Sequence, residues 1–149
     1  MALIQGAFDS SGSAILKIRV AGTHPALEYV AVIDTGFSAF VAMPISAMIE
    51  LGLKSEGAVR VTLGDGSTID NLVARGAVTV GSRTEICDIL LDESTTEVLA
   101  GLTLLRAFKL ALLITETIVL LYDQHETLET VAAFMNTLPT ARPNTPPQN

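Results

Sequence analysis

The chain has 149 residues, a length that suits one domain with its own buried core. Apolar residues make up 49% of it and charged residues only 17%, which excludes a mostly disordered chain. The net charge is −7 and the 9 basic residues are scattered along the sequence. A nucleic-acid partner is therefore not expected, because phosphate binding needs clustered Lys and Arg.

Alternating apolar residues and turn residues follow one another along the chain, which predicts a mainly β domain. In chain order, strands are expected at residues 3–8, 14–20, 27–33, 37–43, 59–63, 68–74, 76–81, 85–91 and 117–122. The strand at 27–33 is apolar at most positions, so it is expected to be buried on both faces. Short helices are expected at 45–51 and 103–109, and residues 124–135 have some helical spacing.

Several single residues within this pattern have simple structural interpretations. The pair Asp65-Gly66 predicts a hairpin between the strands on either side of it. His24 precedes a proline in a turn, so a structural role is expected for it. Cys87 is the only cysteine, and its position in a predicted strand favours a small buried residue over a reactive thiol. With one Cys and two His in the chain, no metal site and no other cofactor are expected.

Residues 98–114 have about the length of a membrane span, but Arg106 and Lys109 lie in the middle. Each would cost about 2.5–3.5 kcal/mol at a bilayer centre, so a short buried helix leading into a strand is expected, and no membrane association. The N-terminal residues resemble no signal peptide, which predicts a cytoplasmic protein. Residues 1–138 are expected to form the domain, and the Pro-rich residues 139–149 a disordered tail.

The triplet Asp34-Thr35-Gly36 carries the most chemical information in the sequence. Apolar residues precede it, so Asp34 is expected where a strand leaves the core. Gly36 permits close approach of the backbone and leaves its N–H group free to reach a carboxylate. Ser38 follows as a small polar residue. Alone, such a triplet is a weak signal, because short matches of this kind arise by chance.

A carboxylate on a glycine turn after a buried strand resembles the catalytic acid of aspartic peptidases, and that chemistry needs two carboxylates side by side. Two carboxylates about 3 Å apart repel by roughly 5 kcal/mol at an effective dielectric of about 20, so one stays protonated and the other charged. The charged one takes a proton from water, and the protonated one polarises the carbonyl group that is attacked. This chain has one such triplet, so either two chains pair to make the site or no such site exists.

Three elements in this order resemble the retropepsin-like aspartic peptidases, which include retroviral proteases and bacterial single-domain relatives. They are the segment Val32–Ser38 followed by Val41–Pro44, the hairpin at Gly64-Asp65-Gly66, and Leu99-Ala100-Gly101 before a short helix. The resemblance covers about residues 12–122. It implies a closed, β-barrel-like acid protease fold and an endopeptidase that cleaves peptides or proteins as a homodimer.

The resemblance also implies a role for each residue that matches. Asp34 would be the catalytic acid and base, one from each chain. Thr35 would make hydrogen bonds between the two chains, Gly36 would support the carboxylate, and Ser38 would bond to the outer oxygen of Asp34. The hairpin residues Gly64, Asp65 and Gly66 would form a mobile flap over the substrate.

Other interpretations remain open from the sequence. The hairpin at Gly64–Gly66 is also typical of an ordinary surface turn, and Asp92-Glu93 is expected to be a solvated strand end. Ala39 and Ala100 depart from the residues usual in the family, and the chain continues beyond the point where retroviral proteases end. The alternative to a peptidase is therefore a catalytically inactive retropepsin-like module for binding or dimerisation.

Overall fold

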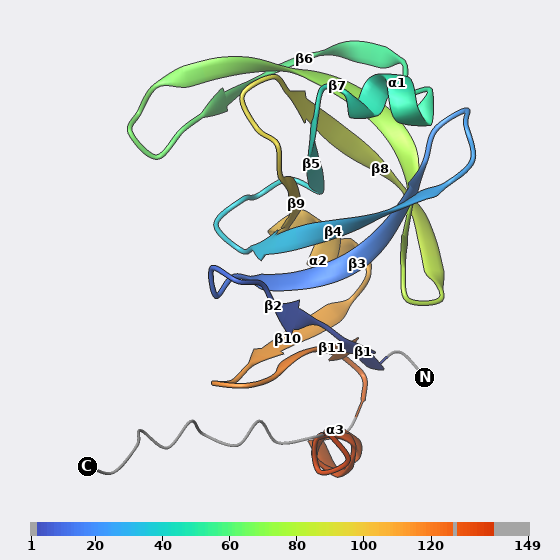
Figure 1. Ribbon diagram of the computed structural model, residues 1–149, viewed down its shortest axis with the longest axis vertical. Helices are drawn as coiled ribbons and strands as arrows, with labels where there is room; N and C mark the ends of the chain where they lie inside the picture. Colours follow the sequence, from blue (N-terminus) through green and yellow to red (C-terminus); the bar gives the residue numbers. More distant parts are fainter. Residues whose placement is uncertain (1–2, 127, 139–149) are drawn as a thin grey trace.

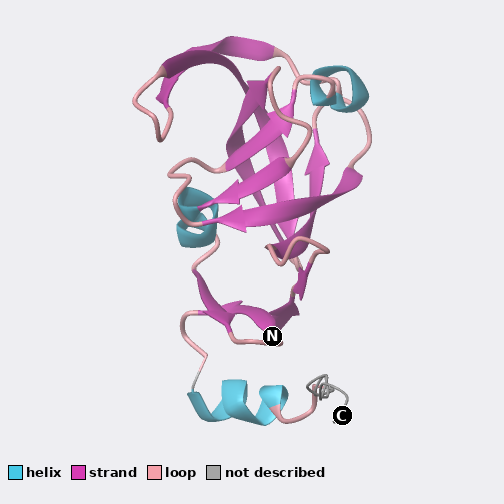
Figure 2. Ribbon diagram, turned by 60° about the vertical axis from the view of Figure 1, so that its left-hand side comes forward, coloured by secondary structure: helices cyan, strands magenta, loops and turns pink. Residues whose placement is uncertain are grey.

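The computed structural model describes residues 3–126 and 128–138, and most of them lie in strands (Figure 1, Figure 2). The strands are β1 (Leu3–Gln5), β2 (Ala7–Phe8), β3 (Ala14–Ala21), β4 (Leu27–Asp34), β5 (Val41–Pro44), β6 (Ser55–Thr62), β7 (Thr68–Val80), β8 (Arg83–Asp92), β9 (Val98–Gly101), β10 (Leu110–Ile114) and β11 (Val119–Asp123). The helices are α1 (Ala47–Leu51), α2 (Leu102–Ala107) and α3 (Leu128–Met135). The predicted mainly β fold is confirmed, whereas the predicted tail at 139–149 lies outside the described residues.

The main sheet closes on itself as a barrel. Neighbouring strands follow the order β3-β4-β9-β5-β8-β7, and β7 pairs in turn with β3 between Arg19↔Thr79 and Ala21↔Ala77. This pairing closes the six strands into a ring, and β2 and β6 continue the sheet beyond it, beside β3 and β7. The interior is filled by apolar side chains that are almost fully buried, among them Ile18, Met43 and Ile89. The predicted closed barrel is thus confirmed.

A second sheet lies beside one end of the barrel, with α3 beyond it (Figure 1). Its three strands are antiparallel in the order β1-β11-β10. Residues 3–8, expected to be one strand, are split at Gly6 between this sheet and the barrel. The Gly6 N–H donates to the Val119 carbonyl oxygen at 2.9 Å, and a Cβ atom there would lie 2.6 Å from the Ile15 carbonyl oxygen. The residue at which the chain crosses between the two sheets must therefore be glycine, because a side chain would not fit between Ile15 and Val119.

Two expected features of the barrel strands are wrong. The strands expected at 68–74 and 76–81 form one strand, β7, because Gly76 pairs normally with Cys87 and leaves room for the Ile89 side chain. The strand β4 is not buried on both faces, since Val30 is 53% exposed. One face of β4 is turned to the core, and the other borders solvent although it also carries apolar residues.

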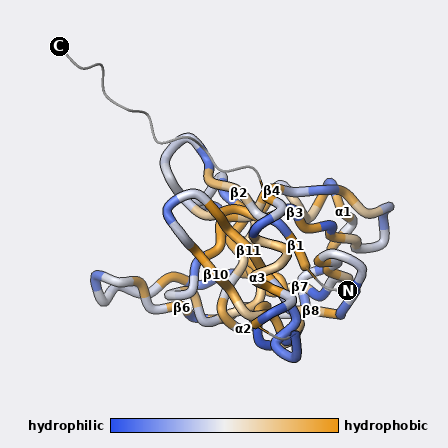
Figure 3. Tube along the Cα trace, turned by 90° about the horizontal axis from the view of Figure 1, so that it is seen from below, coloured by the Kyte–Doolittle hydropathy of each residue, from blue (hydrophilic) through white to orange (hydrophobic). Residues whose placement is uncertain are grey.

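The apolar stretch 98–114 is divided among β9, α2 and β10, as a short helix with strands on both sides. The helix α2 ends at Ala107, and Lys109, two residues later, has a positive φ of 53° where the chain turns into β10. Among the described residues, no helix is both long and apolar enough to cross a membrane. Figure 3 shows the hydrophobic segments gathered in the body of the molecule, while the β6–β7 hairpin projects from it.

Cys87 and His24 have structural positions. Cys87 is 1% exposed, as predicted for a small buried residue. Burial raises the pKa of its thiol to about 11, with further contributions from the negative charges of Glu85 and Asp88. His24 lies in the turn after β3, with its Nδ1 atom 3.1 Å from the Glu50 carbonyl oxygen, so it connects this turn to α1.

The crossing at Gly6 yields a prediction about stability. Gly6→Ala should lower the free energy of unfolding by about 1–3 kcal/mol, because the new methyl group collides with backbone and with the Val119 side chain. Gly64→Ala is the matched control, because a Cβ atom at Gly64 has no neighbour within 4 Å. Urea unfolding of both variants measures the difference, and equal stabilities would show that the two sheets do not meet tightly at Gly6.

The buried thiol yields a second prediction. At pH 8 a thiol with a pKa of about 11 is ionised to roughly one part in a thousand, and the thiolate is the reactive form. Iodoacetamide should therefore modify native Cys87 at least tenfold more slowly than the same chain in guanidinium chloride. Mass spectrometry over time measures both rates. Rapid modification of the native protein would contradict the burial of Cys87.

Candidate active site

The strand pairing around Asp34 brings distant parts of the sequence together. Strand β9 lies between β4 and β5, parallel to β4 and antiparallel to β5. Asp34, the last residue of β4, is in register with Gly101, the last residue of β9. The loop of residues 35–40, which connects β4 to β5, therefore passes around the end of β9.

Backbone hydrogen bonds hold this loop against the end of β9. The Gly101 N–H donates to the Phe40 carbonyl oxygen at 2.8 Å, and the Leu102 N–H donates to the Phe37 carbonyl oxygen at 2.8 Å. A Cβ atom on Gly101 would lie 2.0 Å from the Ala39 carbonyl oxygen, so this contact requires glycine. The strand expected at 37–43 begins only at Val41, because the preceding residues bond to this segment instead of to a neighbouring strand.

The Asp34 side chain lies at the end of β4, where the loop of residues 35–40 begins. It is partly buried, and its Oδ1 atom accepts the Gly36 N–H at 3.0 Å. The Asp34 carbonyl oxygen also accepts the Phe37 N–H at 3.1 Å, so the turn is held on both sides. Within the described part of the chain, Oδ2 has no hydrogen-bond partner. One carboxylate oxygen is thus fixed by the glycine turn, and the other is open to a water molecule or a second carboxylate.

Of the three predicted site residues that follow Asp34, only Gly36 donates a hydrogen bond to its carboxylate. Thr35, Gly36 and Ser38 are exposed. The Gly36 N–H reaches the carboxylate, as the sequence predicts. The hydrogen bonds among residues 3–126 and 128–138 do not join the Ser38 hydroxyl to Asp34. Instead, the Thr103 hydroxyl donates to the Ser38 carbonyl oxygen.

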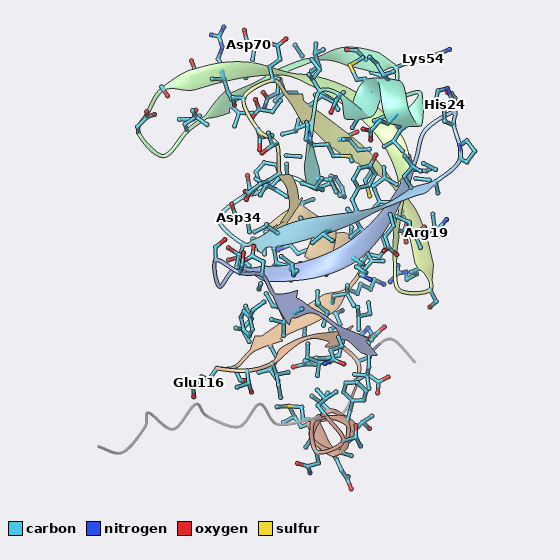
Figure 4. The ribbon with its side chains drawn as sticks, in the orientation of Figure 1. Arg19, His24, Asp34, Lys54, Asp70 and Glu116 are labelled. Atoms are coloured by element: carbon cyan, nitrogen blue, oxygen red, sulfur yellow. The ribbon has the colours of Figure 1, made fainter. Side chains whose placement is uncertain are left out.

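The hairpin predicted at Gly64-Asp65-Gly66 is confirmed as the connection between β6 and β7. Its tip is closed by the Gly66 N–H, which donates to the Leu63 carbonyl oxygen at 2.9 Å. The hydroxyl and N–H groups of Ser67 donate to Asp65 and lower the pKa of its carboxyl group. Figure 4 shows Asp34 at the end of β4, on the same side of the view as the projecting tip.

A cleft of about 590 Å³ lies between the loop after Asp34 and the β6–β7 hairpin. Its lining consists of Gly36, Phe37, Ser38, Ala39, Phe40, Val59, Arg60, Val61, Thr62, Val73, Asp88, Leu90 and Thr103. Most of its walls are apolar, so an extended apolar chain would be removed from water there.

Thr103 and the β6 residues of this cleft were not predicted from the sequence to belong to the site. Thr103 is the one hydroxyl residue in the apolar run Leu99–Leu105, which is a signal that sequence reasoning could have used. The alternation of Val59 and Val61 predicted a strand, but only the folding of the hairpin over the loop shows that these residues line a cleft.

One chain alone supplies a single carboxylate, that of Asp34, at the end of β4. Asp88, which also lines the cleft, is paired with Arg75 at 3.4 Å. Within the described ranges, no group of three His, Cys, Asp or Glu residues is arranged to hold a metal ion. A single chain therefore presents one open carboxylate oxygen beside an apolar cleft.

No protein-family model matches the sequence, and no curated protein matches it. Solved structures do match the fold. A retropepsin-like aspartic protease from Rickettsia conorii aligns with a TM-score of 0.62 and 19% identity, over 82% of this chain and 91% of that chain. EIAV protease, solved with the inhibitor HBY-793, aligns with a TM-score of 0.53 and 10% identity, over 72% of this chain and 98% of that chain.

These alignments cover nearly the whole of both solved chains, at identities that are informative about fold alone. They agree with the closed, mainly β barrel described above. The chain therefore has the retropepsin-like fold of aspartic proteases.

Proposed function

We propose that this protein is an aspartic endopeptidase that acts as a homodimer, with one Asp34 from each chain. The observation that carries the proposal is the position of Asp34. Its carboxylate lies on a glycine turn, held by backbone hydrogen bonds against the end of β9, in a protein with the retropepsin-like fold. The unpartnered Oδ2 atom is the acceptor that a second Asp34 or a shared water molecule would approach.

In the proposed mechanism, the two Asp34 side chains share one proton, because two adjacent carboxylates cannot both ionise near neutral pH. The charged carboxylate takes a proton from a water molecule held between the two. The other carboxyl group donates a hydrogen bond to the scissile carbonyl oxygen, which becomes negative as water attacks. The Gly36 N–H keeps each carboxylate in place during the proton transfers.

The substrate would be an extended peptide bound between the loop 35–40 and the hairpin. One of its apolar side chains would occupy the cleft and contact Phe37, Phe40 and Val61. The tip at Gly64–Gly66 would close over it as a flap. Thr35 would bond across the dimer axis, and Ser38 would reach the outer carboxylate oxygen once the partner chain is present.

The second candidate is a retropepsin-like module that binds or dimerises without catalysis. The absence of a Ser38–Asp34 hydrogen bond among the described residues favours this candidate, as does the chain beyond β11, which adds α3. The two candidates differ in one measurable property, which is the cleavage of a peptide bond.

The peptidase proposal predicts the effect of Asp34→Asn. This variant keeps the acceptor for the Gly36 N–H but removes the ionisable group, so peptide cleavage should fall by at least 10³-fold. Asp9→Asn is the matched control, because the Asp9 carboxylate accepts the Ser11 N–H at 2.9 Å in the same type of turn. Hydrolysis of a fluorogenic peptide library, with and without pepstatin, measures both. Full activity in Asp34→Asn would exclude the mechanism, and no cleavage by the unmodified chain would favour the inactive module.

Sharing of the site between chains predicts a non-linear mixing effect. When unmodified and Asp34→Asn chains are mixed equally and allowed to exchange, about one quarter of the dimers contain two carboxylates. Activity should then be about one quarter of that of unmodified chains at the same total concentration, whereas independent chains would retain about half. Sedimentation velocity at the assay concentration gives the fraction of dimer. A strictly monomeric protein that is active would overturn the homodimer.

A further inference from the structure

A second, smaller pocket lies where β7 and β8 separate, at the base of the β6–β7 hairpin. The last pair between these strands on this side is Leu72↔Leu91, and the chain leaves β8 at Asp92. The pocket has a volume of about 230 Å³ and is lined by Ile45, Ile69, Asp70, Asn71, Leu72, Leu91, Asp92, Glu93 and Ser94. None of these residues lines the cleft beside Asp34, so the pocket is a separate place on the molecule.

The packing of the fold does not explain why the side chain buried beside this pocket, that of Asn71, is polar. It is 7% exposed and is the one buried polar residue among those that the structure describes. Its side chain has no hydrogen-bond partner within residues 3–126 and 128–138. The described residues contain no fully enclosed side-chain polar atom without a partner, so the amide of Asn71 still reaches the pocket that it lines.

The charged groups of the pocket are all negative. Asp92 accepts the N–H and the hydroxyl of Ser94 at 2.8 and 2.7 Å through Oδ1, which leaves Oδ2 available. Glu93 is exposed and makes no ion pair with any residue that the structure describes. Asp70 is paired with Arg60 at 3.1 Å on the hairpin, and Figure 4 shows it above the barrel, away from Asp34. The pocket is lined by no Lys or Arg, so its negative charge exceeds what nearby cations neutralise.

We propose that this pocket binds an aliphatic cation, such as an arginine or lysine side chain or a free amine of the same shape. The stem lies on the aliphatic side chains of Ile45, Ile69 and Leu91. The cationic head donates hydrogen bonds to the amide oxygen of Asn71 and to the Asp92 carboxylate, which suits a guanidinium with five N–H donors and no acceptor. An organic cation fits better than a metal ion, because the described residues hold no cluster of three metal-binding side chains.

Titration of the full chain with agmatine, followed by ¹H–¹⁵N NMR, tests this proposal. We expect saturable shifts centred on the Asn71 side-chain amide, Leu91 and Asp92, and none with 1-pentanol, which has a similar stem and no charge. Asn71→Leu and Asp92→Asn should each weaken binding about tenfold, because each removes a hydrogen bond to a charged group. Asp65→Asn makes the same change of charge at the hairpin tip and should leave the affinity unchanged.

Two arms of the titration distinguish the sources of the cation. Tighter binding of an arginine-containing pentapeptide than of agmatine assigns the pocket to a polypeptide, and the reverse order assigns it to a free amine. No saturation with either at about 10 mM would overturn the proposal. An equal loss of affinity in Asp65→Asn would also overturn it, because binding would then follow net charge alone. The measurement needs no proteolysis, so it is independent of the function proposed for Asp34.

Discussion

The contact between Gly101 and the loop after Asp34 is the constraint on which the candidate site depends. Strand β9 must end against the loop, because the N–H groups of Gly101 at its end and of Leu102 at the start of α2 donate the hydrogen bonds that the loop carbonyl groups accept. It can approach so closely only without a side chain at residue 101. The same placement of β9 between β4 and β5 completes the barrel, so the fold and the position of the carboxylate have one cause.

Local signals in the sequence predicted what depends on neighbouring residues. The Asp65-Gly66 turn, the glycine after Asp34 and the buried Cys87 lie as expected, because turn geometry and strand alternation are set within a few residues. The segment Leu99-Ala100-Gly101 was also singled out from the sequence, through a resemblance that connects segments far apart in the chain, but the contact of Gly101 with the loop after Asp34 was not predicted. Comparison of the folds supports that resemblance at identities of 19% and 10%.

Pairing between distant segments was not predictable from the sequence. The division of residues 3–8 at Gly6 depends on Val119, and the continuity of β7 through Gly76 depends on its partner β8. Val30 illustrates the same limit, because an apolar residue in a strand indicates no particular face until the neighbouring elements are known. Asn71 is a comparable case, since its polarity became informative only when its burial was known.

The arrangement of the second sheet restricts how two chains can join. Strand β11 is already paired on both sides, with β1 and with β10, so among the described strands of this sheet only these two have a free edge. A partner chain that extends this sheet must therefore pair with β1 or β10. Strand β10 is entirely apolar in sequence, and Ile114 at its end is 50% exposed. Strand β1 is shorter and ends at the crossing at Gly6, so β10 offers the longer edge for addition of a strand.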